Sequence, residues 1–274
     1  MIRIDSQMAI AFLGGGNMAR AMLTGLQREG HVMARVLVIE PDAARGQALI
    51  DDFGVQVKSR QVKAISATAL VVLAVKPQLC NGVVESVASR LHAQSTLLSI
   101  VAGVEVSRIR AKLGREDVTV VRVMPNSPAQ IGCGISVLFS SDAEELHRAR
   151  AEYLMRTAGE LLWVQNEVQM HAVTAISGSG PAYFFLMAEV MAASGVAMGL
   201  PADVAARLAN YTAYGAGRML AELGVDAPTL RQQVTSPNGT TQAALDAMYD
   251  GGLPDVMRRA VAAAQKRSKA LSKE

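Results

Sequence analysis

The stretch Met8–Ala19, read MAIAFLGGGNMA, decides the fold of this chain. An apolar run ends at Leu13, and the spacing that follows, Gly14-x-Gly16-x-x-Ala19, is typical of the turn between a buried strand and a helix in dinucleotide-binding proteins. Gly14 permits the sharp turn, and Gly16 lacks the Cβ that would hold the backbone away from a pyrophosphate. The stretch therefore predicts a dinucleotide site, although an ordinary strand-turn-helix without a ligand has the same local pattern.

Strand and helix patterns alternate through the first part of the chain. Apolar runs predict buried strands at four further places: Arg35–Glu40, Ala69–Val75, Ser95–Ile100 and Val118–Met124. Shorter strands are expected at Val55–Val57, near Cys133–Phe139 and at Glu160–Val164. Helical stretches separate most of these strands, which is the signature of a doubly wound parallel α/β sheet of the Rossmann type.

Three of the predicted strands end in loops that suit a ligand site. The glycine turn ends the first strand, Lys76-Pro77 follows another, and Pro125-Asn126 follows a third. Because the carboxyl ends of parallel strands meet at one edge of the sheet, we expect these loops to line the cofactor crevice.

The strand signals stop at about residue 165, and helical patterns take over. One helix leads to Ser177, one covers Pro181–Met198, one covers Ala202–Leu223, and shorter pieces reach Leu271. Small residues crowd the segment 205–217, which favours close helix–helix approach. With 274 residues in all, the pattern predicts a dinucleotide-binding domain over 1–165 and an all-α domain over 166–274.

Composition argues against several other classes of protein. The formal net charge is only +3, and no aromatic residues interleave the basic C-terminal end, so nucleic-acid binding is not expected. Cys80 and Cys133 have no C-x-x-C or histidine-rich partner, which indicates reduced thiols in a cytoplasmic protein and no metal site. The apolar run Tyr183–Leu200 is interrupted by Glu189, so it fits an interface helix better than a membrane span.

Glu40 closes the second predicted strand, where a carboxylate can receive the ribose diol of a bound dinucleotide. A carboxylate there favours NADH, because it would repel the 2′-phosphate of NADPH. Arg45 could still reach a phosphate if Glu40 turned outward to solvent. The same sequence pattern would be seen if Glu40 were only a solvent-exposed residue at the end of a strand.

The segment Val234–Met248 carries the clearest chemistry of the helical part. Ser236 is a good N-cap, and Pro237 suits the first helical position. The next N–H groups would then be free to bind a carboxylate, namely those of Asn238, Gly239 and Thr240. Taken alone, this segment is explained more simply as a well-capped surface helix.

Five motifs taken together change that interpretation. They are FLGGGNMA at Phe12–Ala19, AVKPQ at Ala74–Gln78, MPNSPA at Met124–Ala129, SGSGPAYFF at Ser177–Phe185 and VTSPNGTTQAAL at Val234–Leu245. With them, the sequence resembles the pyrroline-5-carboxylate reductase family of proline biosynthesis over essentially its whole length. The resemblance implies a Rossmann domain, an all-helical substrate-binding and dimerisation domain over 166–274, a homodimer or homodecamer, and reduction of a cyclic imine that bears a carboxylate. It also implies NADPH as cofactor, with NADH as a plausible substitute.

The resemblance also implies roles for individual residues. The substrate carboxylate binds the turn Asn238–Thr241, where Thr241 hydrogen-bonds the substrate nitrogen as the catalytic residue, and Glu167 reaches the substrate pocket. Ser236 matches a serine near the nicotinamide. The cofactor-binding candidates are Gly14, Gly16, Asn17, Met18, Glu40, Gln61, Ala74, Lys76, Pro77, Ala102 and Asn126. Gln61 stands where asparagine is usual in the family.

The substrate chemistry explains why no strong catalytic base is evident. Protonation of the imine nitrogen makes the neighbouring carbon electrophilic, so the protein mainly positions the reactants. A β-hydroxyacid dehydrogenase would share the two-domain plan but needs a lysine in its helical domain, and none occurs between Lys112 and Lys266. A non-catalytic dinucleotide sensor is the third possibility. The hydroxyl groups of the segment SPNGTT are present, and this counts against a loss of catalysis.

Overall fold

The computed structural model describes residues 4–60 and 63–272. The chain forms two compact units, the first made of Met1–Gly178 with Gln265–Glu274 and the second of Ser179–Ala264. The first unit thus includes two segments that the sequence pattern groups with the helical domain, 166–178 and 265–274.

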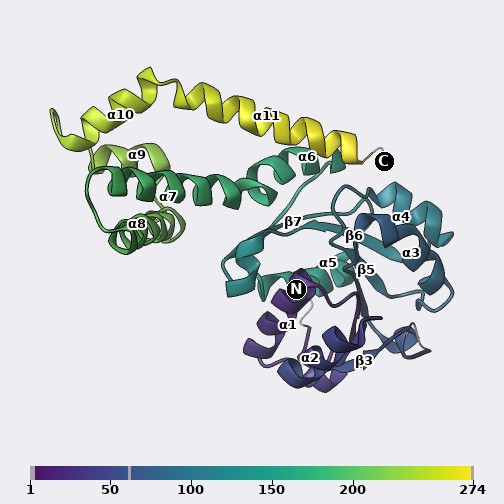
Figure 1. Ribbon diagram of the computed structural model, residues 1–274. Helices are drawn as coiled ribbons and strands as arrows, with labels where there is room; N and C mark the ends of the chain where they lie inside the picture. The colour runs from purple at the N-terminus through teal and green to yellow at the C-terminus, as the bar shows by residue number, and fades with distance from the viewer. Residues whose placement is uncertain (1–3, 61–62, 273–274) are drawn as a thin grey trace. The chain divides into compact units, whose positions relative to one another are not determined.

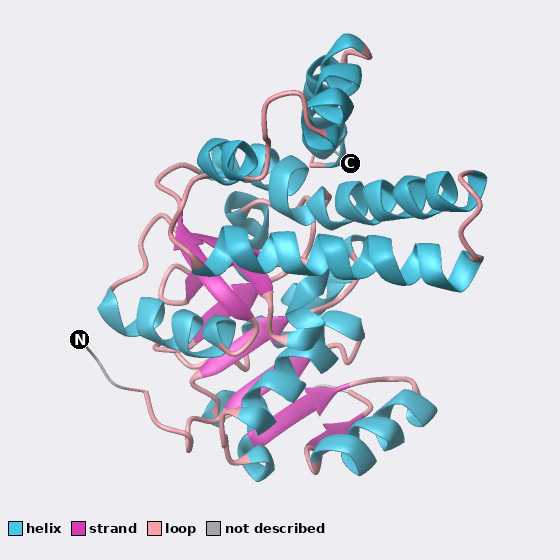
Figure 2. Cartoon of the chain, turned by 90° about the vertical axis from the view of Figure 1, so that its left-hand side faces the viewer, coloured by secondary structure: helices cyan, strands magenta, loops and turns pink. Residues whose placement is uncertain are grey.

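The first unit is built on a twisted sheet of eight strands in the order β3-β2-β1-β4-β5-β6-β7-β8 (Figures 1 and 2). The strands are β1 Ile10–Leu13, β2 Val36–Ile39, β3 Gln56–Lys58, β4 Leu70–Leu73, β5 Thr96–Ser99, β6 Thr119–Met124, β7 Gly134–Phe139 and β8 Gly159–Trp163. From β1 the chain adds strands on one side, to β3, and then crosses to add β4 on the other side of β1. The strand order therefore reverses between β1 and β4, next to the glycine turn. That point is where a doubly wound fold binds its ligand.

The sheet is mostly parallel, as predicted, but one strand pair, β6 and β7, is antiparallel. The link between these two strands is the segment 125–133, which contains the short 3₁₀ turn Ser127–Ile131. A parallel pair requires a crossover of a dozen or more residues, which this link cannot supply. The other strand pairs are parallel.

Helices cover both faces of the sheet (Figure 1). Side chains from α1 (Asn17–Arg28), α2 (Ala43–Phe53) and α5 (Glu145–Arg156) join one core cluster. Side chains from α3 (Cys80–Ala88) and α4 (Val106–Leu113) join the other. The central strands are buried on both faces, which is why they appear in the sequence as continuous apolar runs.

The end of the first unit is a short helical segment, α6 (Met170–Val173), followed by a π-helical turn, Thr174–Gly178. The last turns of the C-terminal helix belong to the same unit. His171 and Ser268, both buried, are joined by a hydrogen bond of 3.0 Å between Nδ1 and Oγ. This contact ties the C-terminal end of the chain to α6.

The second unit is all helical, as predicted. Its helices are α7 (Gly180–Ala197), α8 (Ala202–Glu222), α9 (Ala227–Gln233), α10 (Thr240–Asp250) and α11 (Leu253–Leu271), which runs on into the first unit. The shorter helices expected before Leu271 are α9, α10 and α11, and α11, with 19 residues, is nearly as long as α8.

The small residues of α8 allow close packing at only part of their length. A Cβ on Gly195 of α7 would lie 3.1 Å from the Cβ of Ala205, so α7 and α8 approach closely there. A Cβ on Gly215 or Gly217 would meet no atom within 4 Å among the described residues. The expected close approach therefore occurs near Ala205 and Ala209, which are buried, and not at the glycines.

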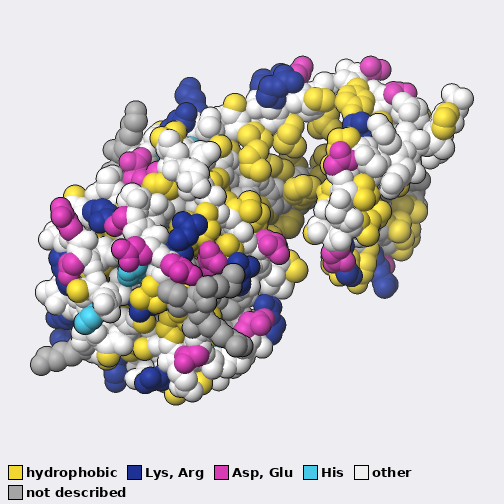
Figure 3. Space-filling model, turned by 180° about the vertical axis from the view of Figure 1, so that it is seen from behind, with side chains coloured by type: hydrophobic (Ala, Val, Ile, Leu, Met, Phe, Trp, Pro, Cys, Tyr) yellow, Lys and Arg dark blue, Asp and Glu magenta, His cyan; other side chains and the backbone are white. Residues whose placement is uncertain are grey.

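The helical unit exposes large apolar side chains. On α7 and α8 they include Phe184, Phe185, Leu186, Val190, Leu208, Tyr211, Tyr214 and Leu220, and Figure 3 shows hydrophobic side chains gathered over these helices. By length and composition alone, the helical segment Glu167–Ala197 would be able to cross a membrane, with 11% of its apolar window buried. One such helix is weak evidence for a membrane span, and an exposed apolar surface is also what an interface requires.

Candidate active site

The glycine turn has the geometry that a dinucleotide pyrophosphate needs. Gly14 has a φ of +104°, and a Cβ on it would lie 2.5 Å from the carbonyl oxygen of Ala74. Its N–H donates to the carbonyl of Ile39 at 2.9 Å, so the turn is held between the ends of β2 and β4. A Cβ on Gly16 would meet no described atom within 4 Å, and no side chain caps α1. The backbone here forms an open cradle beside free helix N–H groups, which fits an anionic phosphate group.

Glu40 lies directly behind this turn and points inward. Its side chain is only 4% exposed. Oε2 accepts hydrogen bonds from the N–H of Gly15 at 3.0 Å and from Nη1 of Arg45 at 3.1 Å, while Oε1 accepts from the N–H of Asp42 at 2.9 Å. The carboxylate is therefore part of the scaffold that holds the glycine turn, and Glu40 is not a solvated strand end.

The other predicted cofactor residues lie around the same edge of the sheet. Lys76, Pro77, Ala102 and Asn17 are exposed there, and Ala74 and Met18 are half-buried. They follow β1, β4 and β5, whose carboxyl ends share one edge because these strands are parallel. Gln61 lies outside the described residues.

Asn126 does not present a free side chain at this edge. The residue is buried, with Nδ2 donating to the carbonyl of Ser177 at 3.2 Å and Oδ1 accepting from the N–H of Ile135 at 2.9 Å. Beside it, a Cβ on Gly178 would lie 2.5 Å from Cε of Met124. Asn126 therefore joins the end of β6 to the π-helical turn that opens the SGSGPAY motif, a contact that the sequence pattern does not reveal.

Glu167 forms a buried ion pair that sequence reasoning missed. Its Oε1 accepts hydrogen bonds from Nη1 of Arg122 and from the N–H of Val106, both at 2.8 Å. The Arg122 side chain is 5% exposed and that of Glu167 is 21% exposed. One signal pointed to this pair: Arg122 is a charged residue within an otherwise apolar predicted strand, and a buried charge needs a partner.

The histidines serve packing contacts and form no catalytic pair among the described residues. Burial lowers the pKa of His31, His147 and His171, which favours their neutral forms. His31 is bonded to Tyr153 and His147 to Thr96, each through Nδ1. No three His, Cys, Asp or Glu side chains in the described part of the chain are grouped to hold a metal ion.

The predicted substrate turn in the second unit has a different cap from the one expected. Helix α10 begins at Thr240 with Gly239 as N-cap, so Ser236 is not the N-cap and Pro237 is not helical. The N–H of Gly239 donates to the carbonyl of Ser236 at 3.0 Å, and Asn238 has a φ of +56°. Proline followed by a left-handed residue is the pattern of a type II turn, which explains why the helix starts later.

This turn leaves the first N–H groups of α10 available. No side chain caps the helix, and at this end the N–H of Ala243 donates to the carbonyl of Gly239 at 3.2 Å. The available groups are therefore those of Thr240, which was predicted, and of Thr241 and Gln242, which take the place of Asn238 and Gly239. A Cβ on Gly239 would lie 2.4 Å from Oγ of Ser236 and 3.1 Å from its carbonyl oxygen, so a larger residue there would force the Ser236 side chain to move.

Two family models match the chain. One, described as pyrroline-5-carboxylate reductase dimerisation, matches residues 167–271. The other, described as NADP oxidoreductase coenzyme F420-dependent, matches residues 9–103.

Individual relatives agree with these matches. The pyrroline-5-carboxylate reductase of Pseudomonas aeruginosa is 37% identical over 97% of this chain and 97% of its own length. The solved structure of a pyrroline-5-carboxylate reductase from Coxiella burnetii superposes with a TM-score of 0.93 at 34% identity, covering 98% of this chain and 100% of that one. A Plasmodium falciparum pyrroline carboxylate reductase solved with NADP bound has the same fold, with a TM-score of 0.84 at 24% identity over 97% of this chain and 98% of that one.

Proposed function

This chain belongs to the pyrroline-5-carboxylate reductase family, and from that premise we propose which of its residues carry the reaction. It is an oxidoreductase that transfers a hydride from NAD(P)H to 1-pyrroline-5-carboxylate and gives proline. The observation that carries this conclusion is the identity with curated reductases over nearly the whole length.

The cofactor supplies the hydride, and residues of the first unit bind and orient it. The backbone at Gly14–Gly16 and the first turn of α1 bind the pyrophosphate, because their N–H groups favour an anion. The remaining cofactor contacts come from Asn17, Met18, Ala74, Lys76, Pro77, Ala102 and, near the adenosine, Gln61. Asn126 lies near the nicotinamide but makes no side-chain hydrogen bond to it, since both polar atoms of its side chain are already hydrogen-bonded within the protein.

The substrate carboxylate binds at the N-terminus of α10. The turn of Ser236, Asn238 and Gly239 leaves the N–H groups of Thr240 and Thr241 without a side-chain cap. An uncapped helix N-terminus stabilises a carboxylate by hydrogen bonds and by the helix dipole.

Thr241 donates its hydroxyl hydrogen to the substrate nitrogen or to the water that protonates it. The residue is half-buried in the first turn of α10. A proton held at nitrogen makes the imine carbon a better hydride acceptor, so positioning replaces a strong base. We also assign Glu167 to substrate binding through Oε2, since Oε1 already accepts hydrogen bonds from Nη1 of Arg122 and the N–H of Val106.

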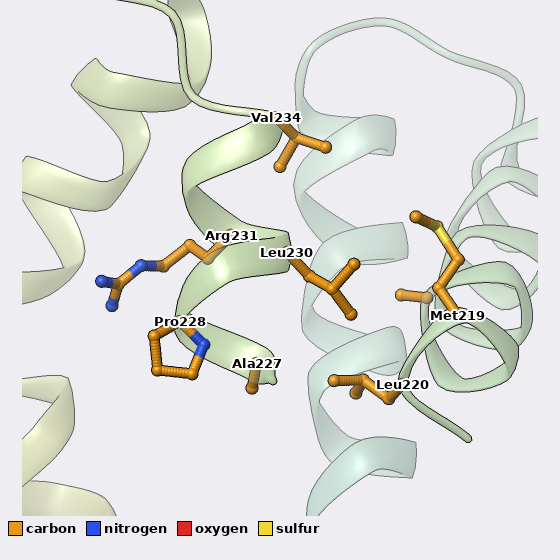
Figure 4. Close-up of a pocket in the computed structure, with 8 residues that line it drawn as sticks. Met219, Leu220, Ala227, Pro228, Leu230, Arg231 and Val234 are labelled. Carbon is orange, nitrogen blue, oxygen red and sulfur yellow. The ribbon is translucent and has the colours of Figure 1, made fainter. Parts of the chain in front are cut away.

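The helical unit joins copies of the chain into a homodimer, with a homodecamer as the higher assembly implied by the family. Exposed aromatic and aliphatic side chains on α7 and α8 form the surface that association would cover. A hollow of about 480 Å³ between α8 and α9 adds to this surface, where Leu230 points toward Met219 and Leu220 while Arg231 points away (Figure 4). We place the enzyme in the cytoplasm, acting on a small molecule and on neither nucleic acid nor membrane.

The role of Thr241 is tested by pre-steady-state oxidation of NADPH with racemic 1-pyrroline-5-carboxylate. Thr241→Ala should lower turnover by about 10–1000-fold and change NADPH affinity little. Thr24→Ala, the same change on the exposed side of α1, should leave both unchanged. Wild-type turnover in Thr241→Ala would show that the hydroxyl serves only the helix.

A further inference from the structure

The side chains behind the glycine turn bear on which nicotinamide cofactor the enzyme prefers. The sequence predicts that Glu40 accepts both hydroxyls of the adenosine ribose and so favours NADH. That interpretation needs a carboxylate with two available acceptor positions that faces the ligand. The structure supplies neither condition.

Glu40 has almost no acceptor capacity left for a ribose. A carboxylate has about four acceptor positions, and three of them are occupied by the N–H of Gly15, the N–H of Asp42 and Nη1 of Arg45. Both positions of Oε2 are used, so only one on Oε1 remains. A ribose diol would have to displace a protein donor from a side chain that is 4% exposed.

Arg45 presents the opposite situation. Its guanidinium has five N–H donors, and its side chain is 50% exposed. One N–H is bonded to Glu40, and the nearest oxygen of Asp42 lies 3.9 Å from Nη2, beyond hydrogen-bond distance. Among the described residues, no other hydrogen bond to this guanidinium is found. It therefore offers oriented donors at the carboxyl end of β2.

The guanidinium of Arg45 faces two carboxylates, Glu40 at 3.1 Å and Asp42 at 3.9 Å, so an added anion would be held by the N–H donors that remain free and not by an excess of positive charge. The negative charge of Glu40 is matched by the guanidinium and by two backbone N–H groups. Asp42 is half-exposed and caps α2 by accepting the N–H of Arg45 at 2.8 Å. The carbonyl of Lys58, at the end of β3, accepts the N–H of Glu40 at 2.9 Å, which ties the end of β2 to the neighbouring strand.

We propose that Arg45 binds the 2′-phosphate of NADPH and that Glu40 is a positioning residue that holds the guanidinium at the end of β2. This inference rests on the proposed reductase function and names the residue that sets its cofactor preference. In Rossmann proteins an arginine near this strand end accommodates the 2′-phosphate, where an acidic side chain would otherwise take the ribose. Here the acidic side chain and the arginine act together, and the preference is for NADPH.

Binding of the adenosine halves of the cofactors tests the proposal without catalysis. The probes are 2′-phospho-ADP-ribose and ADP-ribose, titrated calorimetrically into the full-length protein. The wild type should bind the phosphorylated probe more tightly than ADP-ribose. The ratio of the two affinities should fall as salt is added. Arg45→Met, which keeps an apolar stem of similar length, should weaken the phosphorylated probe by about 10–100-fold and ADP-ribose by less than about threefold.

Two further variants keep the result interpretable. Arg45→Lys retains the charge but loses the planar fork, so its ratio should lie between those of the wild type and Arg45→Met. Arg156→Met removes an exposed arginine of α5 that pairs with Glu152, and its ratio should equal that of the wild type. Thermal unfolding shows that each variant is folded.

Three results would contradict the proposal, and they separate it from the assignment as a reductase. An unchanged ratio in both Arg45 variants would refute the role of Arg45 alone. A wild-type preference for ADP-ribose would restore the ribose-diol role of Glu40. If neither probe bound the wild type, the dinucleotide site itself would be refuted, and the proposed function with it.

Discussion

Replacing Arg122 by methionine should destabilise the first unit by about 2–3 kcal/mol. The guanidinium is 5% exposed and forms a 2.8 Å ion pair with Oε1 of Glu167. Removal of one partner from a fully buried pair costs about 3–5 kcal/mol. Glu167 is 21% exposed and keeps the N–H of Val106 as a donor, so water and that donor reduce the cost. For domains of this size, such a loss lowers the midpoint of thermal unfolding by about 4–12 °C.

The assay is thermal and urea unfolding at one fixed chain concentration, because the stability of an oligomer depends on concentration. Glu167→Gln and the double variant complete a cycle, and the two effects should fall short of additivity by about 1–2 kcal/mol. Arg156→Met removes an exposed ion pair and should cost less than about 1 kcal/mol. The reasoning is refuted if Arg122→Met costs no more than Arg156→Met, or if the cycle is additive.

Three other predictions concern the same unit. Gly14→Ala should destabilise the fold by about 2–4 kcal/mol, because φ is +104° and the new Cβ would meet a backbone oxygen at 2.5 Å. Gly16→Ala should fold normally and lose dinucleotide affinity. Equal unfolding midpoints for the two variants would contradict this prediction. Asn126→Ala should cost about 1–3 kcal/mol in urea unfolding, because a buried N–H and a carbonyl lose their partners, and an unchanged midpoint would mean that water replaces the amide. Burial lowers the pKa of His31 and His171 in the folded state. The free energy of unfolding is therefore unaffected by their titration above the unfolded-state pKa of about 6.5, and it decreases as pH falls from that value through the folded-state pKa. The unfolding midpoint of His171→Gln should therefore depend less on pH in that range than that of the wild type.

The strands and the glycine turn could be predicted because their causes are local. Central parallel strands are buried on both faces, so continuous apolar runs marked β1 and β4 to within a few residues. The turn at Gly14 requires a left-handed residue, and the positive φ confirms that reason. The strand β7 was predicted but its antiparallel direction was not, because strand direction depends on the length of the connection, which the apolar pattern does not record.

The contacts of the site were harder to predict because they join segments distant in sequence. Arg122 and Glu167 meet only when β6 is in the sheet, and Asn126 reaches Ser177 across a similar separation. The inward direction of Glu40 depends on the N–H of Gly15, which the fold brings to it. The start of α10 was misplaced for a local reason, since a proline turn and an N-cap share the same residue types.

The most direct test of the reductase assignment follows a deuterium atom from the cofactor into the product. Purified protein is given racemic 1-pyrroline-5-carboxylate and NADPH deuterated at the transferable position, and the proline formed is examined by mass spectrometry and NMR. The assignment predicts one deuterium per proline, located at the former imine carbon, with one NADPH oxidised for each proline formed. NADPH oxidation that does not depend on the imine, or proline without deuterium, would contradict it.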